Sequence, residues 1–239
     1  MSPEVIAELA PTGVLRAGIN MGNFLLVTGR SVLGDPEGVS PSMAKAVADR
    51  LGVPVHYVPF AKPGPLADAV DDNVWDIGLI GAEPQRAEKI AFTAAYAEIE
   101  ATYLVPAGSP ITQISQVDSP GVRIAVTARA AYDLWLERNI KNATVLRVEG
   151  GALTKFRDEG LEVLAGLRPG LLTDLESLPG ARILDGQFTA VQQAIGTQRR
   201  NTLGAAFLRA FVEEAKASGL VARLIEQHKV RGLSVAPAV

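Results

Sequence analysis

The sequence predicts an α/β protein with two lobes, in which short apolar strands alternate with amphipathic helices. Apolar residues make up 48% of the 239 residues, which is enough for well-packed cores. Strand-like and helix-like runs alternate in two series, and a segment rich in Pro and Gly at 106–110 separates them. We expect a first lobe of residues 1–104 plus 192–239 and a second lobe of residues 105–191. Extended runs at 99–105 and 188–196 should connect the lobes.

The first lobe should start with a strand over 14–20 and a helix over 40–51. Ser40 suits the N-cap of this helix, Pro41 suits its first position, and Gly52 ends it. One helical face carries the apolar side chains Met43, Ala44, Val47, Ala48 and Leu51. The pattern then predicts strands over 53–60 and 75–80, with a short helix over 65–70 between them.

The second lobe repeats the alternation, and two helices close the chain. The expected strands are 122–127, 144–148, 162–167 and 181–184. The expected helices are 130–139, 153–158 and 168–178, followed by 202–217 and 220–227 after the second extended run.

Composition excludes several classes of function. A net charge of -3 without a basic stripe argues against a nucleic-acid partner, and the lack of cysteine excludes disulfides and thiol catalysis. No apolar run reaches the roughly 20 residues that span a bilayer. No side-chain spacing indicates a catalytic triad or a metal site, so we predict no catalytic residue, metal or cofactor. The first residues do not resemble a signal peptide, which implies a cytoplasmic protein if this start is native.

One stretch indicates an anion site. A strand ends at Gly81, a helix begins near Pro84, and Arg86 lies in the first turn of that helix. Backbone N–H groups at a helix start and a guanidinium together can bind an anion. In the alternative interpretation, Arg86 pairs with Glu83 or Glu88 on an exposed helix and contributes little.

Several motifs in register carry a family resemblance. They read LRAGIN at 15–20, GVSPSMAKAVADRLGVPVHYVPF at 38–60, WDIGLIGAEPQRAEKIAFT at 75–93, VRIAVTARAAYDLWL at 122–136, LEVLAGLRPGLL at 161–172 and FVEEAKASGLVARLI at 211–225. The chain thus resembles type II periplasmic solute-binding proteins of family 3, the substrate-binding components of amino-acid ABC transporters. The resemblance implies a two-lobe periplasmic-binding-protein-like II fold with a double-strand hinge. It also implies a monomer in the periplasm that captures a small molecule between the lobes and delivers it to a permease.

The resemblance also assigns roles to residues. Arg86 should grip a ligand carboxylate, backbone groups at Gly81 and Ala82 should assist, and Phe24 should cover the ligand. The family's Gly-Thr-Thr-like helix start falls on Arg129, Ala130 and Ala131. The aspartate that receives the ligand ammonium in the family falls on Leu167.

These departures change the expected ligand. A buried ammonium without a carboxylate partner would cost several kcal/mol, so an ordinary α-amino acid is disfavoured. Arginines at 86, 129 and 168 suit a carboxylate or dicarboxylate without an ammonium. The full set of expected ligand contacts is Asn23, Phe24, Gly81, Ala82, Glu83, Arg86, Arg129, Ala130, Ala131, Leu167, Arg168 and Gln193.

Some alternatives stay open on the sequence alone. Phe24 suits a core as well as a ligand cover, Asn23 suits a turn, and Arg129 suits a solvated surface. One of Gln192 and Gln193 should face the ligand if strand alternation holds.

Two other functions fit the same scaffold. A dehydratase-like enzyme would need a carboxylic acid, and Glu83 and Glu162 are the candidates. A cytoplasmic ligand sensor would need a separate partner protein.

Overall fold

A computed structural model describes residues 2–239 and divides them into two compact units. Unit 1 contains the residues up to Glu98 together with Gln192–Val239, and unit 2 is Ile99–Val191. The expected boundary after residue 104 needs correction. Residues 101–104 pair with the strand Val163–Leu167 and therefore belong to the sheet of unit 2.

The strands of unit 1 follow the expected pattern. Strand β1 (Leu15–Asn20) lies between β4 (Val55–Phe60) and β5 (Ile77–Gly81), and all three are parallel. Strand β12 (Thr189–Gln198) runs antiparallel to β5 and also pairs with β6 (Ile90–Phe92). All five residues of β5 are buried, which places the end of this strand inside the unit.

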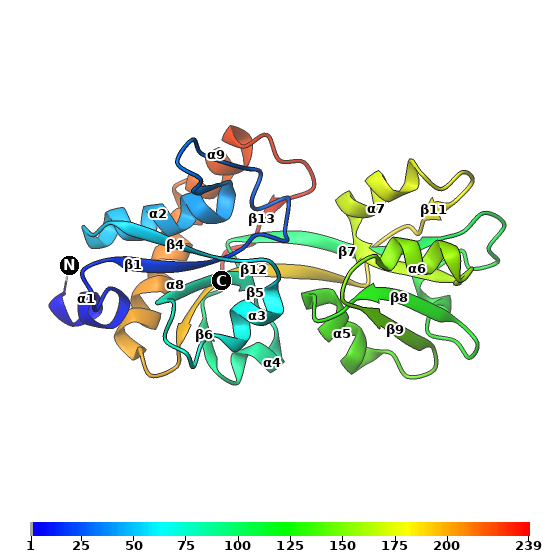
Figure 1. The fold of residues 1–239 in the computed structure, drawn as a ribbon, viewed down its shortest axis with the longest axis horizontal. Coiled ribbons are helices and arrows are strands. Elements are labelled where there is room, and N and C mark those ends of the chain that lie inside the picture. The colour runs from blue at the N-terminus through cyan, green and yellow to red at the C-terminus, as the bar shows by residue number, and fades with distance from the viewer. Residues whose placement is uncertain (1) are drawn as a thin grey trace. The chain divides into compact units, whose positions relative to one another are not determined.

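The helices of unit 1 cover this sheet (Figure 1). They are α1 (Pro3–Leu9), α2 (Val39–Leu51), α3 (Pro63–Asp68), α4 (Pro84–Ala87), α8 (Thr202–Ala217) and α9 (Leu220–Gln227). The two tail helices have the bounds that the sequence predicts. Helix α1, which the sequence analysis did not predict, lies against α8, where the Gly204 N–H donates to Glu8 Oε2 at 2.7 Å.

The start of α2 differs from the expectation. Gly38 is the N-cap, with φ 147°, and a Cβ atom there would lie 2.2 Å from the Leu26 carbonyl oxygen. Ser40 lies inside the helix and is buried, with its hydroxyl 2.7 Å from the Tyr96 hydroxyl. The expected cap at Ser40 and first position at Pro41 are therefore wrong, because a close backbone approach fixes the start at glycine.

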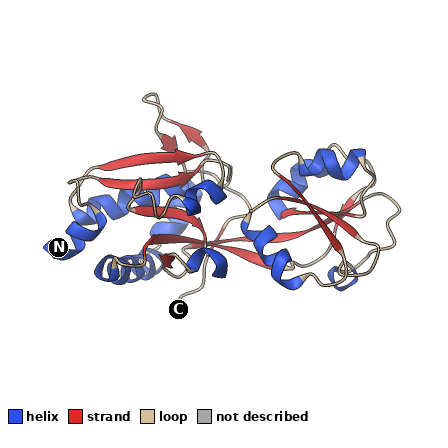
Figure 2. Cartoon of the chain, turned by 60° about the horizontal axis from the view of Figure 1, so that its bottom comes forward, coloured by secondary structure: helices blue, strands red, loops and turns tan. Residues whose placement is uncertain are grey.

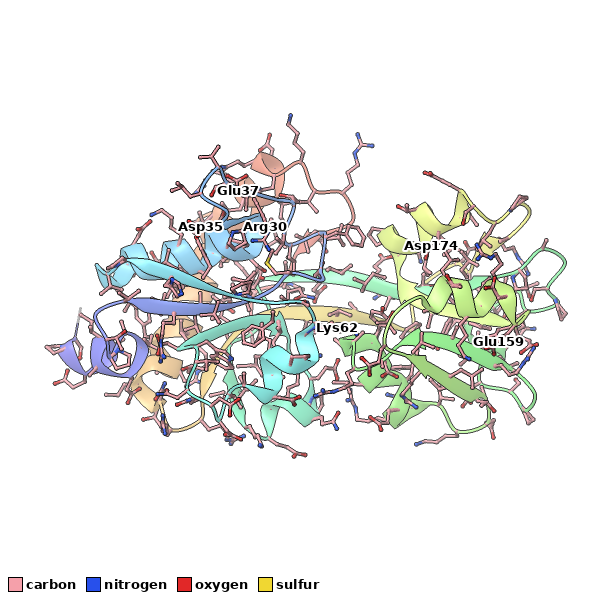
Figure 3. The ribbon with its side chains drawn as sticks, viewed as in Figure 1. Arg30, Asp35, Glu37, Lys62, Glu159 and Asp174 are labelled. Carbon is pink, nitrogen blue, oxygen red and sulfur yellow. The ribbon has the colours of Figure 1, made fainter. Side chains whose placement is uncertain are left out.

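Two short pairings complete unit 1. Strands β2 (Gly29–Arg30) and β3 (Pro36–Glu37) form a hairpin, and β13 (Ser234–Val235) pairs with the first residues of β7 (Ala97–Val105). Arg30 Nη1 donates to the Gly34 carbonyl at 2.8 Å and so stiffens the hairpin turn. The charged hairpin side chains Arg30, Asp35 and Glu37 are labelled in Figure 3.

The strands of unit 2 follow one another in the order β7–β10–β8–β9. Strands β8 (Arg123–Thr127), β9 (Thr144–Val148) and β10 (Val163–Leu167) are parallel, whereas β7 runs antiparallel to β10. The short strand β11 (Arg182–Ile183) pairs with β7.

Helices pack on both faces of the unit 2 sheet (Figure 2). They are α5 (Ala131–Asn139), α6 (Ala152–Asp158) and α7 (Arg168–Leu175), with a 3₁₀ turn at Ile114–Gln116. Leu136 of α5 packs with Ile124 and Val126 on one face. Phe156 of α6 packs with Ala125 on the other face, as strand alternation requires.

Candidate functional site

Arg86, the first predicted ligand contact, is buried in helix α4, which follows β5. Its residue surface is 7% exposed, and Nη1 donates to the Gly81 carbonyl oxygen at 2.8 Å. The interpretation of Arg86 as a solvated helix residue is therefore wrong. Helix α4 has only four residues, so its dipole is small and the guanidinium supplies the positive charge of the site.

Two predicted neighbours of Arg86 serve the backbone structure around it. Glu83 is the N-cap residue of α4, is 9% exposed, and accepts the Ala87 N–H with its carbonyl at 2.9 Å. The Ala82 N–H donates to the Gln192 carbonyl at 2.7 Å, so this amide is part of the sheet and is not directed to a ligand.

Gln193 is brought beside Gly81 by the pairing of β12 with β5. The two residues are direct partners in register. Because Ala82 and Gln192 form the hydrogen-bonded pair, Gly81 and Gln193 form the non-hydrogen-bonded pair, in which side chains approach most closely. The structure thus brings Gln193 beside Gly81, which contacts Arg86, although Gln193 is far from both in sequence.

Asn23 and Phe24 lie in the turn after β1. Asn23 Oδ1 accepts the Leu25 N–H at 3.1 Å, and its carbonyl accepts the Leu26 N–H at 3.0 Å, so its side chain builds the turn. Phe24 is 54% exposed and is therefore not a core residue. This leaves its aromatic ring available as a cover for a ligand.

In unit 2, a loop with one buried carboxylate precedes α5. Arg129 is exposed and adopts a left-handed conformation with φ 61°. Asp133 is 2% exposed; its Oδ2 accepts the Arg129 backbone N–H at 2.8 Å, and its Oδ1 accepts Arg147 Nε at 2.8 Å. Burial raises the pKa of Asp133, and these two hydrogen bonds oppose the rise. No local sequence pattern indicates this role of Asp133, because its partner Arg147 lies on a different element.

The other predicted residues at this edge of unit 2 are apolar and packed. Ala131 forms a buried cluster with Ala101 and Val191, and Leu167 packs against that cluster. Ala130 is the N-cap residue of α5 and has no side-chain capping bond. The structure therefore places no carboxylate or hydroxyl at these three predicted positions.

Arg168 has partners inside unit 2. Its Nε lies 2.5 Å from Glu100 Oε2, and Nη2 donates to the Gly186 carbonyl. The charge of this third predicted arginine is thus balanced by Glu100.

A second carboxylate of unit 2, Asp174, was not predicted from the sequence. Asp174 projects from α7 (Figure 3) and is half-buried. Burial raises its pKa. Burial also raises the pKa of Tyr132, to which the charges of Asp133 and Asp174 add, while a hydrogen bond with Thr127 opposes the rise. Within residues 2–239 the Asp174 carboxylate has no hydrogen-bond or ion-pair partner.

Glu162 does not suit the role of a proton donor. Its Oε1 lies 2.7 Å from Arg123 Nη2, and its Oε2 accepts both the Nε and the backbone N–H of Arg123 at 2.9 Å. These bonds lower the pKa of Glu162, so the carboxylate is ionised at neutral pH. In the part of the chain that is described, no group of three or more His, Cys, Asp or Glu side chains could hold a metal.

Comparisons with known proteins agree with this architecture. The family model of the bacterial extracellular solute-binding proteins, family 3, matches residues 28–230. No curated protein matches the chain in sequence. None of the helices described over residues 2–239 has the length and apolar character needed to cross a membrane.

Solved structures match over nearly the whole chain. An ancestral amino-acid-binding protein, AncCDT-1, a precursor of cyclohexadienyl dehydratase, has a TM-score of 0.74 at 18% identity, with 93% of this chain and 97% of that chain covered. A histidine kinase sensor domain with similarity to periplasmic binding proteins has a TM-score of 0.74 at 16% identity and coverages of 93% and 98%. The amino-acid ABC transporter substrate-binding protein AbpA from Streptococcus pneumoniae, bound to L-arginine, has a TM-score of 0.72 at 15% identity and coverages of 93% and 98%. At these identities the likenesses establish the fold.

Proposed function

Because the chain belongs to the bacterial extracellular solute-binding proteins of family 3, we propose that it captures a small carboxylate-bearing metabolite. The observation that carries this proposal is the buried guanidinium of Arg86, oriented by the Gly81 carbonyl. A planar guanidinium presents a rigid fork of donors that matches the two oxygens of a carboxylate. Burial strengthens such a contact, since little water competes for it.

We further propose that the preferred ligand has no ammonium group. The position that would receive an ammonium carries Leu167, which packs against the apolar cluster around Ala131. A dicarboxylate or another organic acid avoids the cost of an unpaired ammonium.

The proposal is tested by binding measurements on the purified protein. A thermal-shift screen with amino acids, dicarboxylates and aromatic acids identifies ligands, because a ligand that binds only the folded state stabilises it. Isothermal titration calorimetry then compares the wild type with Arg86→Ala. We expect at least a tenfold loss of affinity, since a charge-assisted contact is worth about 1.5–3 kcal/mol.

A matched control removes a different arginine of unit 1. Arg50 pairs with Glu214, and both side chains are well exposed, so Arg50→Ala should leave ligand affinity unchanged. An unchanged dissociation constant in Arg86→Ala would refute the carboxylate contact.

We also propose that the captured solute is passed to the permease of an ABC transporter. Uptake of the labelled ligand by cells should then require both this protein and the permease. The enzymatic alternative retains only Glu83 as a proton donor, because Glu162 is an ionised partner of Arg123. Turnover of a bound ligand that is lost in Glu83→Gln would overturn the assignment as a binding protein.

A further inference from the structure

Gln193 is a buried residue whose side-chain amide has no hydrogen-bond partner among residues 2–239. The residue is 3% exposed, and its backbone carbonyl accepts the Tyr96 N–H at 2.8 Å. Among residues 2–239 the amide group itself has no partner. Buried polar side chains are nearly always hydrogen-bonded, so an unpaired amide in this position calls for a partner from outside the chain.

The position of Gln193 points to the ligand as that partner. Its direct neighbour across the sheet is Gly81, which has no side chain. The carbonyl of the same glycine accepts the Arg86 guanidinium. Gln193 and Arg86 are therefore both neighbours of Gly81.

The amide also borders accessible space. The amide atoms have no partner, but they are not sealed from solvent. Gln192 points to the opposite face of β12, since successive side chains of a strand alternate. Of the two glutamines that the sequence left open, only Gln193 lies beside the site of Arg86.

We infer that Gln193 is a specificity-determining residue, which recognises a neutral oxygen next to the carboxylate held by Arg86. A carboxamide offers both a donor and an acceptor and carries no charge. It matches a hydroxyl or oxo group, whereas it cannot balance an ammonium. The favoured ligand class is therefore the hydroxy and oxo acids. This inference rests on the proposed capture of a carboxylate.

Three four-carbon acids of the same skeleton test the inference. Succinate lacks the substituent, L-malate carries a hydroxyl, and L-aspartate carries an ammonium. Calorimetry with the wild type should give the tightest binding for malate, at least tenfold tighter than for succinate or aspartate. Gln193→Met keeps the length of the side chain and removes its polar atoms. We expect this variant to bind malate about tenfold more weakly and succinate as well as before.

Control variants separate this inference from the proposed function. Gln192→Met, one residue away on the other face of the strand, should leave the affinities for all three acids unchanged. If Arg86→Ala weakens all the acids while Gln193→Met weakens malate and succinate equally, the inference fails and the carboxylate contact stands. Equal wild-type affinities for malate and aspartate also overturn the inference. If none of the acids binds to the wild type, both proposals fail for this ligand class.

Discussion

Replacing Asp133 with asparagine tests how the loop before α5 is held. The carboxylate is 2% exposed and accepts two hydrogen bonds, from the Arg129 backbone N–H and from Arg147 Nε, each at 2.8 Å. Asparagine has almost the same shape, but its amide nitrogen cannot accept a hydrogen bond. In either orientation of the amide, one of the two donors therefore loses its acceptor.

The size of the effect follows from the burial of the two partners. A hydrogen bond to a charged group is worth about 1.5–3 kcal/mol. The substitution also removes a buried charge, whose burial cost is visible in the raised pKa of Asp133. Arg147 is 37% exposed and can turn to water when its partner is lost. We therefore expect a net loss of about 2 kcal/mol in the stability of the loop.

Hydrogen exchange at the Arg129 amide measures this loss directly, because that N–H is one of the two donors. A loss of about 2 kcal/mol corresponds to roughly 30-fold faster exchange through opening of the loop. Glu162→Gln is the matched control. It breaks another carboxylate–arginine pair of unit 2, whose side chains are 42% and 35% exposed, and should cost less than about 1 kcal/mol. The reasoning would be refuted by an unchanged exchange rate at the Arg129 amide in Asp133→Asn. It would also be refuted if the two variants lost equal amounts of stability.

Two further predictions concern the backbone and the pH dependence. Gly38→Ala should lower the free energy of unfolding by about 3 kcal/mol in urea titrations, since the new methyl would lie 2.2 Å from the Leu26 carbonyl oxygen. Gly34→Ala, with φ 88° and no atom within 4 Å, should cost only about 1 kcal/mol, and equal losses would contradict the clash. The ion pair lowers the pKa of Glu162 below its ordinary 4.5, so its stabilisation is present above pH 4.5 and is lost as the pH falls through the lower folded value. The melting temperatures of wild type and Glu162→Gln should accordingly converge in acid, and a gap that widens there would contradict this sign.

Regular elements could be predicted from the sequence because their signals are local. Strand β9 and helices α8 and α9 have the predicted bounds, since apolar periodicity and a glycine at 219 define them. The start of α2 could not be predicted in this way. The constraint that selects Gly38 is its close approach to the distant Leu26 carbonyl, which no local pattern reports.

The candidate site could be predicted only in part, for the same reason. The motif around Gly81 identified Arg86, and strand alternation limited the second contact to Gln192 or Gln193. The pairing of β12 with β5, across more than a hundred residues, places Gln193 opposite Gly81. Likewise, the ion pair of Arg168 with Glu100 joins elements far apart in sequence, so Arg168 looked available on the sequence alone.

The order of the two units along the chain has a consequence for biosynthesis. Unit 2 is one continuous segment, Ile99–Val191, whereas unit 1 needs both ends of the chain. Its sheet takes in β12, and α1 lies against α8, where the Asn201 side chain donates to the Glu8 carbonyl at 3.2 Å. The ribosome therefore completes unit 2 before it completes β12 and α8, which unit 1 requires. During that interval β5 lacks its partner β12, and α1 lacks its partner α8.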